Sequence, residues 1–158
     1  ETASGSTGTP KGVMISHGNM LANLQMITYA FDLSWKSRGL SWLPAYHDMG
    51  LIGGLLAPLY TGCFCVFMSP MAFLQKPIRW LKAISRYKIT ISGGPNFAYD
   101  LCSQQITEEQ MEGLDLSSWC LAYNGAEPIR SSTLGDFSRK FEEVGFNSQA
   151  CYPCYGMA

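Results

Sequence analysis

Charged residues are scarce in this sequence, and so are histidines. Asp, Glu, Lys and Arg make up 15% of the 158 residues, the formal net charge is −1, and there are two histidines. The 11 lysines and arginines are scattered along the chain without forming a stripe, so the electrostatic attraction that nucleic-acid binding requires is missing. We therefore expect no nucleic-acid partner.

No charged residue occurs between positions 49 and 75, a stretch long enough to be tested as a transmembrane helix. Glycine and proline interrupt it at Gly53, Gly54, Pro58 and Gly62. These interruptions favour a buried helix, a turn at Thr61-Gly62, and a strand over residues 63–67 that is fully buried in a sheet. We expect no membrane span.

The six cysteines include two close pairs, Cys63 with Cys65 and Cys151 with Cys154. Together they could bind zinc, and the second pair has the spacing of a thioredoxin-type redox pair. However, the first pair falls in a strand-like run, where both side chains lie on one face, and no helix start follows the second. We interpret all four as structural thiols, predict no metal site, and expect a reducing cytoplasm.

Of the two histidines, His47 is the candidate for a role in chemistry. It follows a predicted strand that Pro44 ends, and loops at strand ends carry the functional groups of open α/β sheets. Asp48 comes next, but adjacent side chains on an extended loop point to opposite sides, so a mutual hydrogen bond is not expected. The pattern gives little support to a Ser-His-Asp hydrolase.

Strands and helices alternate along the chain. Apolar runs predict strands over residues 40–43, 63–67, 89–92, 119–123 and 150–155. Periodicity predicts helices from N-cap Ser16 to about residue 33, from about residue 49, over 77–87, after residue 96 and over 130–144. Residues 104–117, polar and acidic, are expected to be a surface connection. This alternation predicts an α/β fold with a largely parallel sheet covered by helices.

The stretch Ser4–Gly12, S-G-S-T-G-T-P-K-G, has the composition of a phosphate-binding loop. Glycines let backbone N–H groups approach an anion, hydroxyl groups donate hydrogen bonds, and a lysine adds positive charge. The candidate residues are Ser4, Gly5, Ser6, Thr7, Gly8 and Lys11. The loop is not a P-loop, because Lys11 lies between Pro10 and Gly12 instead of following a glycine and preceding Ser or Thr.

Five motifs, in this order, resemble the adenylate-forming enzymes, the superfamily of acyl-CoA synthetases, adenylation domains and fatty acyl-AMP ligases. They are S-G-S-T-G-T-P-K-G-V at 4–13, W-L-P-A-Y-H-D-M-G-L-I-G-G at 42–54, S-G-G-P-N-F-A-Y-D-L-C at 92–102, N-G-A-E-P-I-R at 124–130 and Y-G-M-A at 155–158. Y-H-D-M-G and G-G-P-N-F-A-Y are similar in particular to the fatty acyl-AMP ligase branch. One departure is Ala3, where the family commonly has threonine.

The resemblance implies a reaction in which a fatty-acid carboxylate attacks the α-phosphate of ATP, with Mg2+, and the acyl group then passes to an acyl carrier protein. It implies that Lys11 and His47 are catalytic, with His47 orienting the reacting carboxylate. Besides the phosphate loop, the nucleotide-binding residues would be Asn124, Gly125, Ala126, Glu127, Tyr155, Gly156 and Met157. The substrate-binding residues would be His47, Gly53, Gly54 and Gly94, with Gly53 and Gly54 beside a tunnel for the fatty chain.

Other interpretations of these residues remain open. Gly53 and Gly54 fit close helix–sheet packing equally well, and Glu127 fits an acid at the start of the following helix. An aromatic residue such as Tyr155 is usually part of the core. A fatty acyl-CoA synthetase, or a non-catalytic module of this fold that binds acyl groups or partner proteins, also fits the sequence.

We expect residues 1–158 to be a fragment of one AMP-binding domain. The chain begins with Glu1 and stops inside Y-G-M-A, just before the position where the resemblance places a magnesium-binding glutamate. The resemblance places a C-terminal lid domain with a catalytic lysine further on. The fragment alone is therefore expected to be inactive.

Overall fold

A computed structural model describes residues 2–3 and 11–156, with only the backbone of Thr2, Ala3 and Lys11. Within these residues, a five-stranded parallel sheet has the order β4-β3-β5-β6-β7. Its strands are β3 (Arg38–Ser41), β4 (Phe64–Phe67), β5 (Ile91–Gly94), β6 (Leu121–Asn124) and β7 (Cys151–Pro153). β1 (Thr2–Ala3) and β2 (Lys11–Gly12) pair antiparallel in a separate sheet. The predicted α/β fold with a parallel sheet is confirmed.

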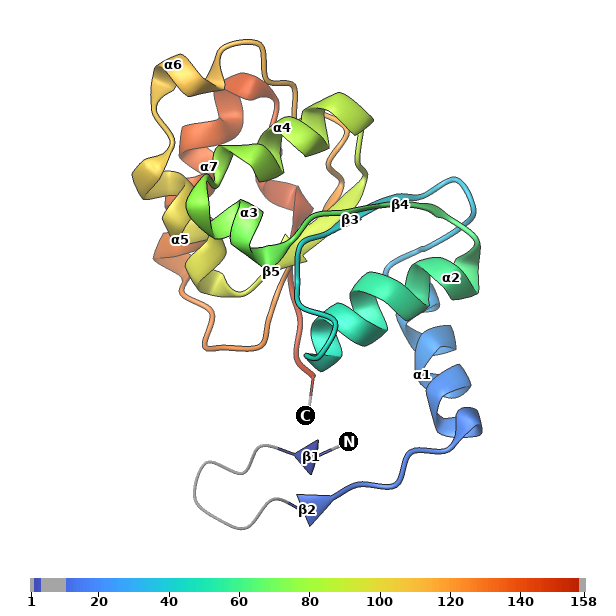
Figure 1. The fold of residues 1–158 in the computed structure, drawn as a ribbon. Helices are drawn as coiled ribbons and strands as arrows, with labels where there is room; N and C mark the ends of the chain where they lie inside the picture. Colours follow the sequence, from blue (N-terminus) through green and yellow to red (C-terminus); the bar gives the residue numbers. More distant parts are fainter. Residues whose placement is uncertain (1, 4–10, 157–158) are drawn as a thin grey trace.

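Helices cover both faces of the parallel sheet (Figure 1). One side carries α3 (Pro70–Gln75), α4 (Ile78–Tyr87), α5 (Asn96–Gln105) and α7 (Ser131–Phe141). The other side carries α1 (His17–Ala30) and the consecutive helices η1 (Met49–Leu56), a π-helix, and α2 (Ala57–Thr61). Short helices in the connections are α6 (Glu108–Met111), η2 (Glu142–Val144) and η3 (Ser148–Ala150). Crossover helices of this kind are what parallel strands require.

Local sequence explains where α1 begins. Ser16 Oγ accepts a hydrogen bond from the Asn19 backbone N–H at 3.1 Å, and the Asn19 side chain accepts one from the Ser16 N–H at 3.0 Å. This reciprocal capping box confirms Ser16 as the N-cap. The helix ends at Ala30, earlier than the predicted residue 33, because Asp32 turns the chain with a φ of 48°.

The core lies between the sheet and helices α3, α4, α5 and α7. Aromatic side chains dominate it: Trp42, Phe73, Trp80, Tyr99, Trp119, Phe137, Phe141 and Phe146. Trp80 Nε1 donates to Ser92 Oγ at 2.8 Å. The Tyr99 hydroxyl donates to the Tyr123 carbonyl oxygen at 2.8 Å. These bonds satisfy the polar edges of buried rings and connect α4 and α5 to the sheet.

Two strand predictions need correction. Of the predicted strand over residues 63–67, residues 64–67 form β4, but Phe64 is 44% and Phe67 58% exposed, because β4 lies at the edge of the described sheet. The strand predicted over residues 89–92 lies later in the chain, over residues 91–94, so that Gly93 and Gly94 are the last residues of β5. Apolar periodicity indicates that a strand exists, but not which neighbours it has.

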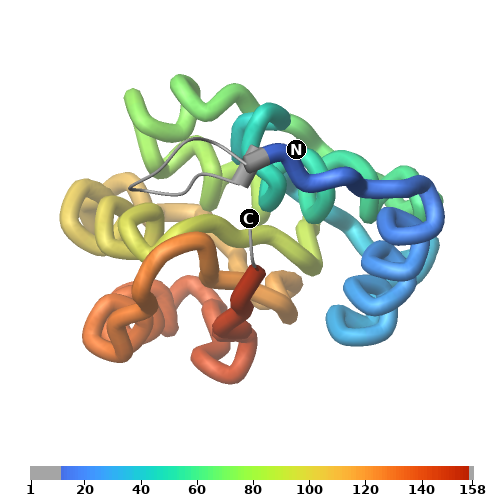
Figure 2. Tube along the Cα trace, turned by 90° about the horizontal axis from the view of Figure 1, so that it is seen from below, coloured from blue at the N-terminus to red at the C-terminus, as the bar shows by residue number. Residues whose placement is uncertain are grey.

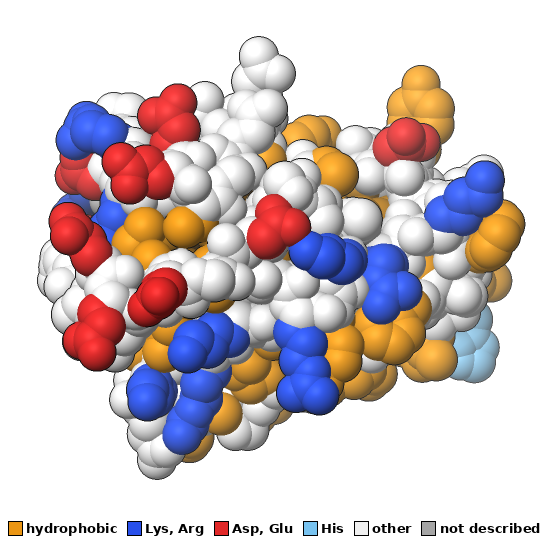
Figure 3. Space-filling view, turned by 90° about the horizontal axis from the view of Figure 1, so that it is seen from above, with side chains coloured by type: hydrophobic (Ala, Val, Ile, Leu, Met, Phe, Trp, Pro, Cys, Tyr) orange, Lys and Arg blue, Asp and Glu red, His pale blue; other side chains and the backbone are white. Residues whose placement is uncertain are grey.

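Charged side chains are distributed unevenly over the surface (Figure 3). Arg79, Lys82 and Arg86 are exposed on α4, so the basic residues are less scattered in space than in the sequence. Residues 104–117 are a surface connection only in part, since Met111 and Leu116 are buried. Among the described residues, no helix is both long enough and apolar enough to cross a membrane.

Candidate functional site

The predicted site residues gather at the edge of the sheet where the parallel strands have their carboxyl ends. His47 follows β3, Gly94 ends β5, Asn124 ends β6 and Tyr155 follows β7. The β1–β2 pair lies at the same end of the molecule in both Figure 1 and Figure 2. Ligands of open α/β sheets bind at this edge. The fold therefore brings together motifs that are far apart in the sequence.

The predicted phosphate loop connects β1 to β2. Thr2 pairs with Gly12 and Ala3 with Lys11, so the two ends of the loop lie side by side. Ser4, Gly5, Ser6, Thr7 and Gly8 lie outside the described residues, as does the side chain of Lys11. Their role as phosphate ligands stays a prediction.

The turn after β6 is held in an unusual conformation. A Cβ atom on buried Gly125 would lie 2.8 Å from both the carbonyl oxygen and Sγ of Cys154, so a larger residue would separate this turn from the segment after β7. Ala126 has a φ of 67°, a left-handed conformation that costs a non-glycine residue about 1 kcal/mol. Such strain is common at ligand sites, and Ala126 lines the cavity described below.

Asn124 is buried at the end of β6 with one polar atom unpaired. Its Nδ2 lies 3.5 Å from Asn96 Oδ1, an oxygen that also accepts the Arg130 backbone N–H at 3.1 Å. Asn124 Oδ1 has no hydrogen-bond partner. Asn124 is 0% exposed and is not among the residues that line the cavity described below, so its predicted contact with the nucleotide stays a prediction.

Glu127 is positioned by a helix. Its Oε1 accepts the Phe97 backbone N–H at 2.6 Å, in the first turn of α5. The carboxylate thus satisfies a free N–H and interacts favourably with the helix dipole. This geometry favours the helix-end interpretation, but at α5 instead of the helix that follows Glu127 in the sequence.

Tyr155 lies outside the core. Tyr155 is 90% exposed. Both Tyr155 and Gly156 line the cavity. The usual core location of an aromatic residue therefore does not apply here. Met157 lies outside the described residues, so its predicted nucleotide contact is not placed.

His47 and Asp48 contact each other, contrary to the expectation for an extended loop. His47 Nδ1 lies 2.7 Å from Asp48 Oδ1. Asp48 has helical φ and ψ of −52° and −44°, and successive side chains of a helical turn diverge by only about 100°. The Met49 N–H donates both to Asp48 Oδ1 at 2.7 Å and to His47 Nδ1 at 3.2 Å, so the start of η1 holds both side chains in place.

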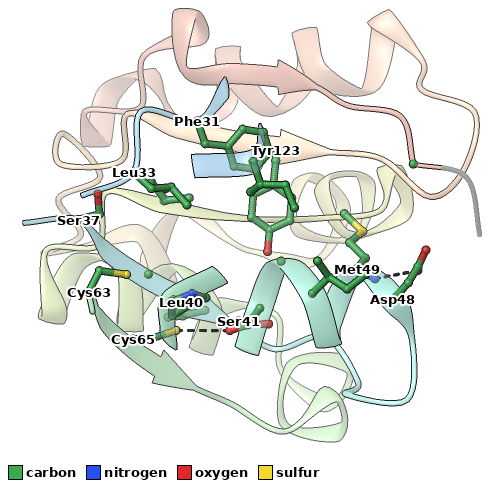
Figure 4. Close-up of a pocket in the computed structure, with 18 of the residues that line it drawn as sticks. Phe31, Leu33, Ser37, Leu40, Ser41, Asp48, Met49, Cys63, Cys65 and Tyr123 are labelled. Atoms are coloured by element: carbon green, nitrogen blue, oxygen red, sulfur yellow. Dashed lines mark hydrogen bonds between the residues drawn. The ribbon is translucent and has the colours of Figure 1, made fainter. Parts of the chain in front are cut away.

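A cavity of about 300 Å3 lies between the sheet and the layer formed by α1 and η1 (Figure 4). Its wall includes Ile27, Phe31, Leu33, Met49, Ile52 and Tyr123. It reaches the carboxyl edge of the sheet, where Asp48, Ala126, Tyr155 and Gly156 line it. Apolar side chains make up much of the wall, with the polar groups concentrated at the edge and along β3. Such a pocket suits a ligand with an apolar chain and a polar head.

The three glycines predicted to contact substrate have different surroundings. Gly53 lines the cavity and is exposed, and a Cβ atom there would meet no atom within 4 Å. Gly54 also lines the cavity, but its Cβ would lie 2.4 Å from Ser41 Oγ. The Cβ of Gly94 would lie 2.5 Å from the Trp42 ring. Gly53 thus has space beside it, whereas Gly54 and Gly94 are needed for close packing.

Burial shifts the pKa values of two groups in the cavity wall. The pKa of the Cys65 thiol is raised to about 11, chiefly by desolvation and further by Cys63. Desolvation likewise raises the pKa of Tyr123, with smaller contributions from Cys65 and Cys154. Both groups are therefore neutral near pH 7 and suit an apolar ligand. The described residues include no group of three or more His, Cys, Asp or Glu side chains that could hold a metal ion.

Sequence reasoning missed Phe31 and Tyr123 as cavity residues. Their rings stack with centroids 6.1 Å apart, and both line the cavity. Phe31 lies within the helix predicted from Ser16 to about residue 33, and Tyr123 lies in the strand predicted over residues 119–123. No local signal shows that α1 and β6 meet, because that contact depends on the order of the strands.

The sequence profile of the AMP-binding enzyme family matches residues 3–158. A medium-chain-fatty-acid–[acyl-carrier-protein] ligase, TtuA of Teredinibacter turnerae, is 51% identical over 155 residues, which are 98% of this chain and 24% of TtuA. A long-chain-fatty-acid–AMP ligase of Mycobacterium marinum, FadD26, is 39% identical over 98% of this chain and 27% of its own length.

Solved structures agree with these sequence matches. The fatty acyl-adenylate ligase of Legionella pneumophila, solved with acyl adenylate and pyrophosphate, is 55% identical, with a TM-score of 0.95 over 99% of this chain and 28% of that chain. The chain thus spans about a quarter of the length of the relatives it matches. It belongs to the AMP-binding enzyme family, and within it to the fatty acyl-AMP ligase branch.

Proposed function

We propose that the complete protein containing these residues activates a fatty acid with ATP. A carboxylate oxygen of the fatty acid attacks the α-phosphorus, the bond to the leaving pyrophosphate breaks, and a fatty acyl-adenylate forms. The observation that carries this proposal is the cavity with an apolar wall that opens at the carboxyl edge of the sheet, beside Ala126 and Tyr155. An acyl chain in this cavity would bring its carboxylate to the edge where the nucleotide motifs gather.

The described residues offer specific roles in this reaction. His47, in contact with Asp48 and next to the cavity, would orient the reacting carboxylate. The exposed ring of Tyr155, which lines the cavity, would pack on the adenine. Reaction rate then depends on holding the carboxylate and the α-phosphate together, since positioning supplies much of the catalysis in such transfers.

Phosphate binding is proposed for the loop between β1 and β2. Lys11 would contact β- or γ-phosphate oxygens and neutralise developing charge. We propose that ATP binds as its Mg2+ complex, because Mg2+ is typically held by one or two carboxylates together with substrate phosphates.

The acceptor of the acyl group is proposed to be the thiol of an acyl carrier protein. TtuA and JamA of Moorena producens are both medium-chain-fatty-acid–[acyl-carrier-protein] ligases, and each is 51% identical to this chain. The alternative acceptor is coenzyme A, as expected for an acyl-CoA synthetase. All six cysteines are free, which favours the cytoplasm as the place of reaction.

The test uses the complete protein with ATP, Mg2+ and labelled pyrophosphate, and measures fatty-acid-dependent exchange of label into ATP. Exchange that requires a fatty acid is the expected result, and no exchange with any chain length would contradict the proposed activation. A second assay supplies carrier protein or coenzyme A with labelled fatty acid. Acyl-CoA as the main product would refute the carrier-protein acceptor while leaving activation intact.

A further inference from the structure

The cavity extends from one edge of the sheet toward the other. β3 and β4 are parallel with Gly39 opposite Cys65, so Ser37 and Cys63 are neighbours at the amino ends of these strands. Both line the cavity, as does Tyr155 beyond the carboxyl end of β7. The four-residue path from Ser41 back to Ser37 spans about 13 Å at the usual rise of a strand. An extended ligand can therefore lie along β3 with its two ends at opposite edges.

Polar atoms mark the sheet side of this path. Figure 4 shows Ser41, Cys63 and Cys65 along β3 and the start of β4, and all three line the cavity. Ser41 is 3% exposed, and its Oγ has no hydrogen-bond partner. This hydroxyl lies in the cavity wall close to Gly54 of η1, and a ligand able to donate or accept a hydrogen bond there would satisfy it.

The two ends of the path differ in chemistry. The carboxyl edge offers the His47–Asp48 pair and the strained turn at Ala126, which suit a polar head. Near the amino edge, Leu33 and the two thiols line the wall, and weakly polar sulfur atoms tolerate a hydrocarbon chain. Under the proposed function, a fatty acid would lie with its carboxylate at the carboxyl edge, near Asp48 and its neighbour His47, and with its terminal carbon near Cys63.

The two thiols differ in how freely they can react. Cys65 Sγ lies 3.8 Å from the Gly54 carbonyl oxygen, and a Cβ atom on Gly39 would lie only 3.2 Å from it, so packing surrounds this sulfur. Its raised pKa leaves little reactive thiolate near pH 7. Cys63 precedes β4, is partly exposed, and lies nearest the amino edge. Cys63 is the thiol that the end of an acyl chain can reach.

We propose that Cys63 is a covalent-modification site for fatty acids whose terminal carbon carries a leaving group. This inference rests on the proposed function, since it uses the acyl site and its orientation. In the reaction, the Cys63 thiolate attacks the terminal carbon of an ω-bromo fatty acid. An S–C bond forms, the C–Br bond breaks, bromide leaves and the thiol proton passes to solvent.

The experiment incubates the complete protein with ω-bromodecanoic acid and maps thioether adducts by mass spectrometry. Cys120 is the internal control, because it is an exposed thiol that does not line the cavity. We expect Cys63 to be alkylated at least about tenfold faster than Cys120, since a bound chain holds the two reacting atoms together. Decanoic acid should protect Cys63 but not Cys120, and ω-bromohexanoic acid should be too short to select Cys63.

Matched variants and the exchange assay separate the possible outcomes. Incubation with ω-bromodecanoic acid should not lower the rate of decanoate-dependent pyrophosphate exchange in Cys63→Ser, compared with the same variant before treatment. The native protein and Cys120→Ser should both lose this exchange after the same treatment. The inference would be overturned if the untreated protein shows decanoate-dependent exchange but mass spectrometry finds equal labelling of Cys63 and Cys120. An adduct on Cys65 would overturn it as well. Absence of decanoate-dependent exchange in the untreated protein would instead contradict the proposed function.

Discussion

Two adjacent glycines of η1 should respond very differently to an added side chain. Gly53 has open space where its Cβ would be, whereas the Cβ of Gly54 would lie 2.4 Å from Ser41 Oγ and 3.0 Å from Ser41 Cβ. Both glycines line the cavity. The pair therefore separates an effect on the acyl site from an effect on packing, within a single turn of one helix.

The magnitudes follow from these surroundings. Gly53→Leu should not destabilise the fold, because a non-glycine residue in a helix is favoured by up to about 1 kcal/mol and no atom lies within 4 Å of the added Cβ. If its side chain displaces methylenes of a bound chain, each one displaced loses about 0.8 kcal/mol, or roughly fourfold in kcat/KM for long fatty acids. Gly54→Ala forces Ser41 or η1 to move and should cost about 1–3 kcal/mol of stability.

The assays are denaturant unfolding and pyrophosphate exchange with a series of fatty acids, both on the complete protein. Gly53→Leu should shift the preferred acid to a shorter chain at unchanged stability. Gly54→Ala should lower the unfolding midpoint. The protein that remains folded should prefer the same fatty-acid chain lengths as the native protein. An unchanged preference in Gly53→Leu, or equal destabilisation by both substitutions, would refute the reasoning.

Three further predictions concern charged residues. Lys11→Ala should lower kcat/KM for ATP roughly 10- to 150-fold without lowering the unfolding midpoint, because a charge-assisted phosphate contact contributes about 1.5–3 kcal/mol; an unchanged rate would remove the loop from the mechanism. Glu127→Gln should lower the free energy of unfolding by up to about 1 kcal/mol through its bond to the Phe97 N–H, whereas a changed KM for ATP at constant stability would identify a nucleotide ligand. Lys88 and Ser117 hold the pKa of Asp115 well below its usual range, so this carboxylate stabilises the fold above about pH 4 and loses that effect as pH falls; in unfolding titrations, the native protein and Asp115→Asn should converge toward low pH.

The sequence predicted the architecture well because the fold depends on local patterns. Alternating apolar strands and amphipathic helices imply a parallel sheet, and the Ser16 cap marks the start of α1. The order of the strands is not local information. For this reason the edge position of β4, with exposed Phe64 and Phe67, could not be predicted from an apolar run that looks the same in a central strand.

The candidate site was predicted less completely. Motifs placed His47, the turn at Asn124–Glu127 and Tyr155 near one another, and their positions after strand ends agree with that placement. Partners were missed: the contact of His47 with Asp48 depends on a helical turn, and the bond of Glu127 depends on the position of α5. Both are set by backbone geometry that the spacing of residues along the chain does not specify.

The two open interpretations of Gly53 and Gly54, tunnel and packing, are compatible, because Gly54 packs closely on Ser41 whereas Gly53 has open space beside the cavity. Gly50 and Gly54 are buried against β3 and the residues that follow it. A Cβ atom on Gly50 would lie 2.2 Å from the Pro44 carbonyl oxygen, and a Cβ atom on Gly54 would lie 2.4 Å from Ser41 Oγ. Such small residues allow η1 to approach the strand closely. Gly53 is one residue away, and a neighbouring helical position points to a different side, so it meets open space at the cavity instead of Ser41. The close approach that two glycines permit is thus what places the third beside the cavity.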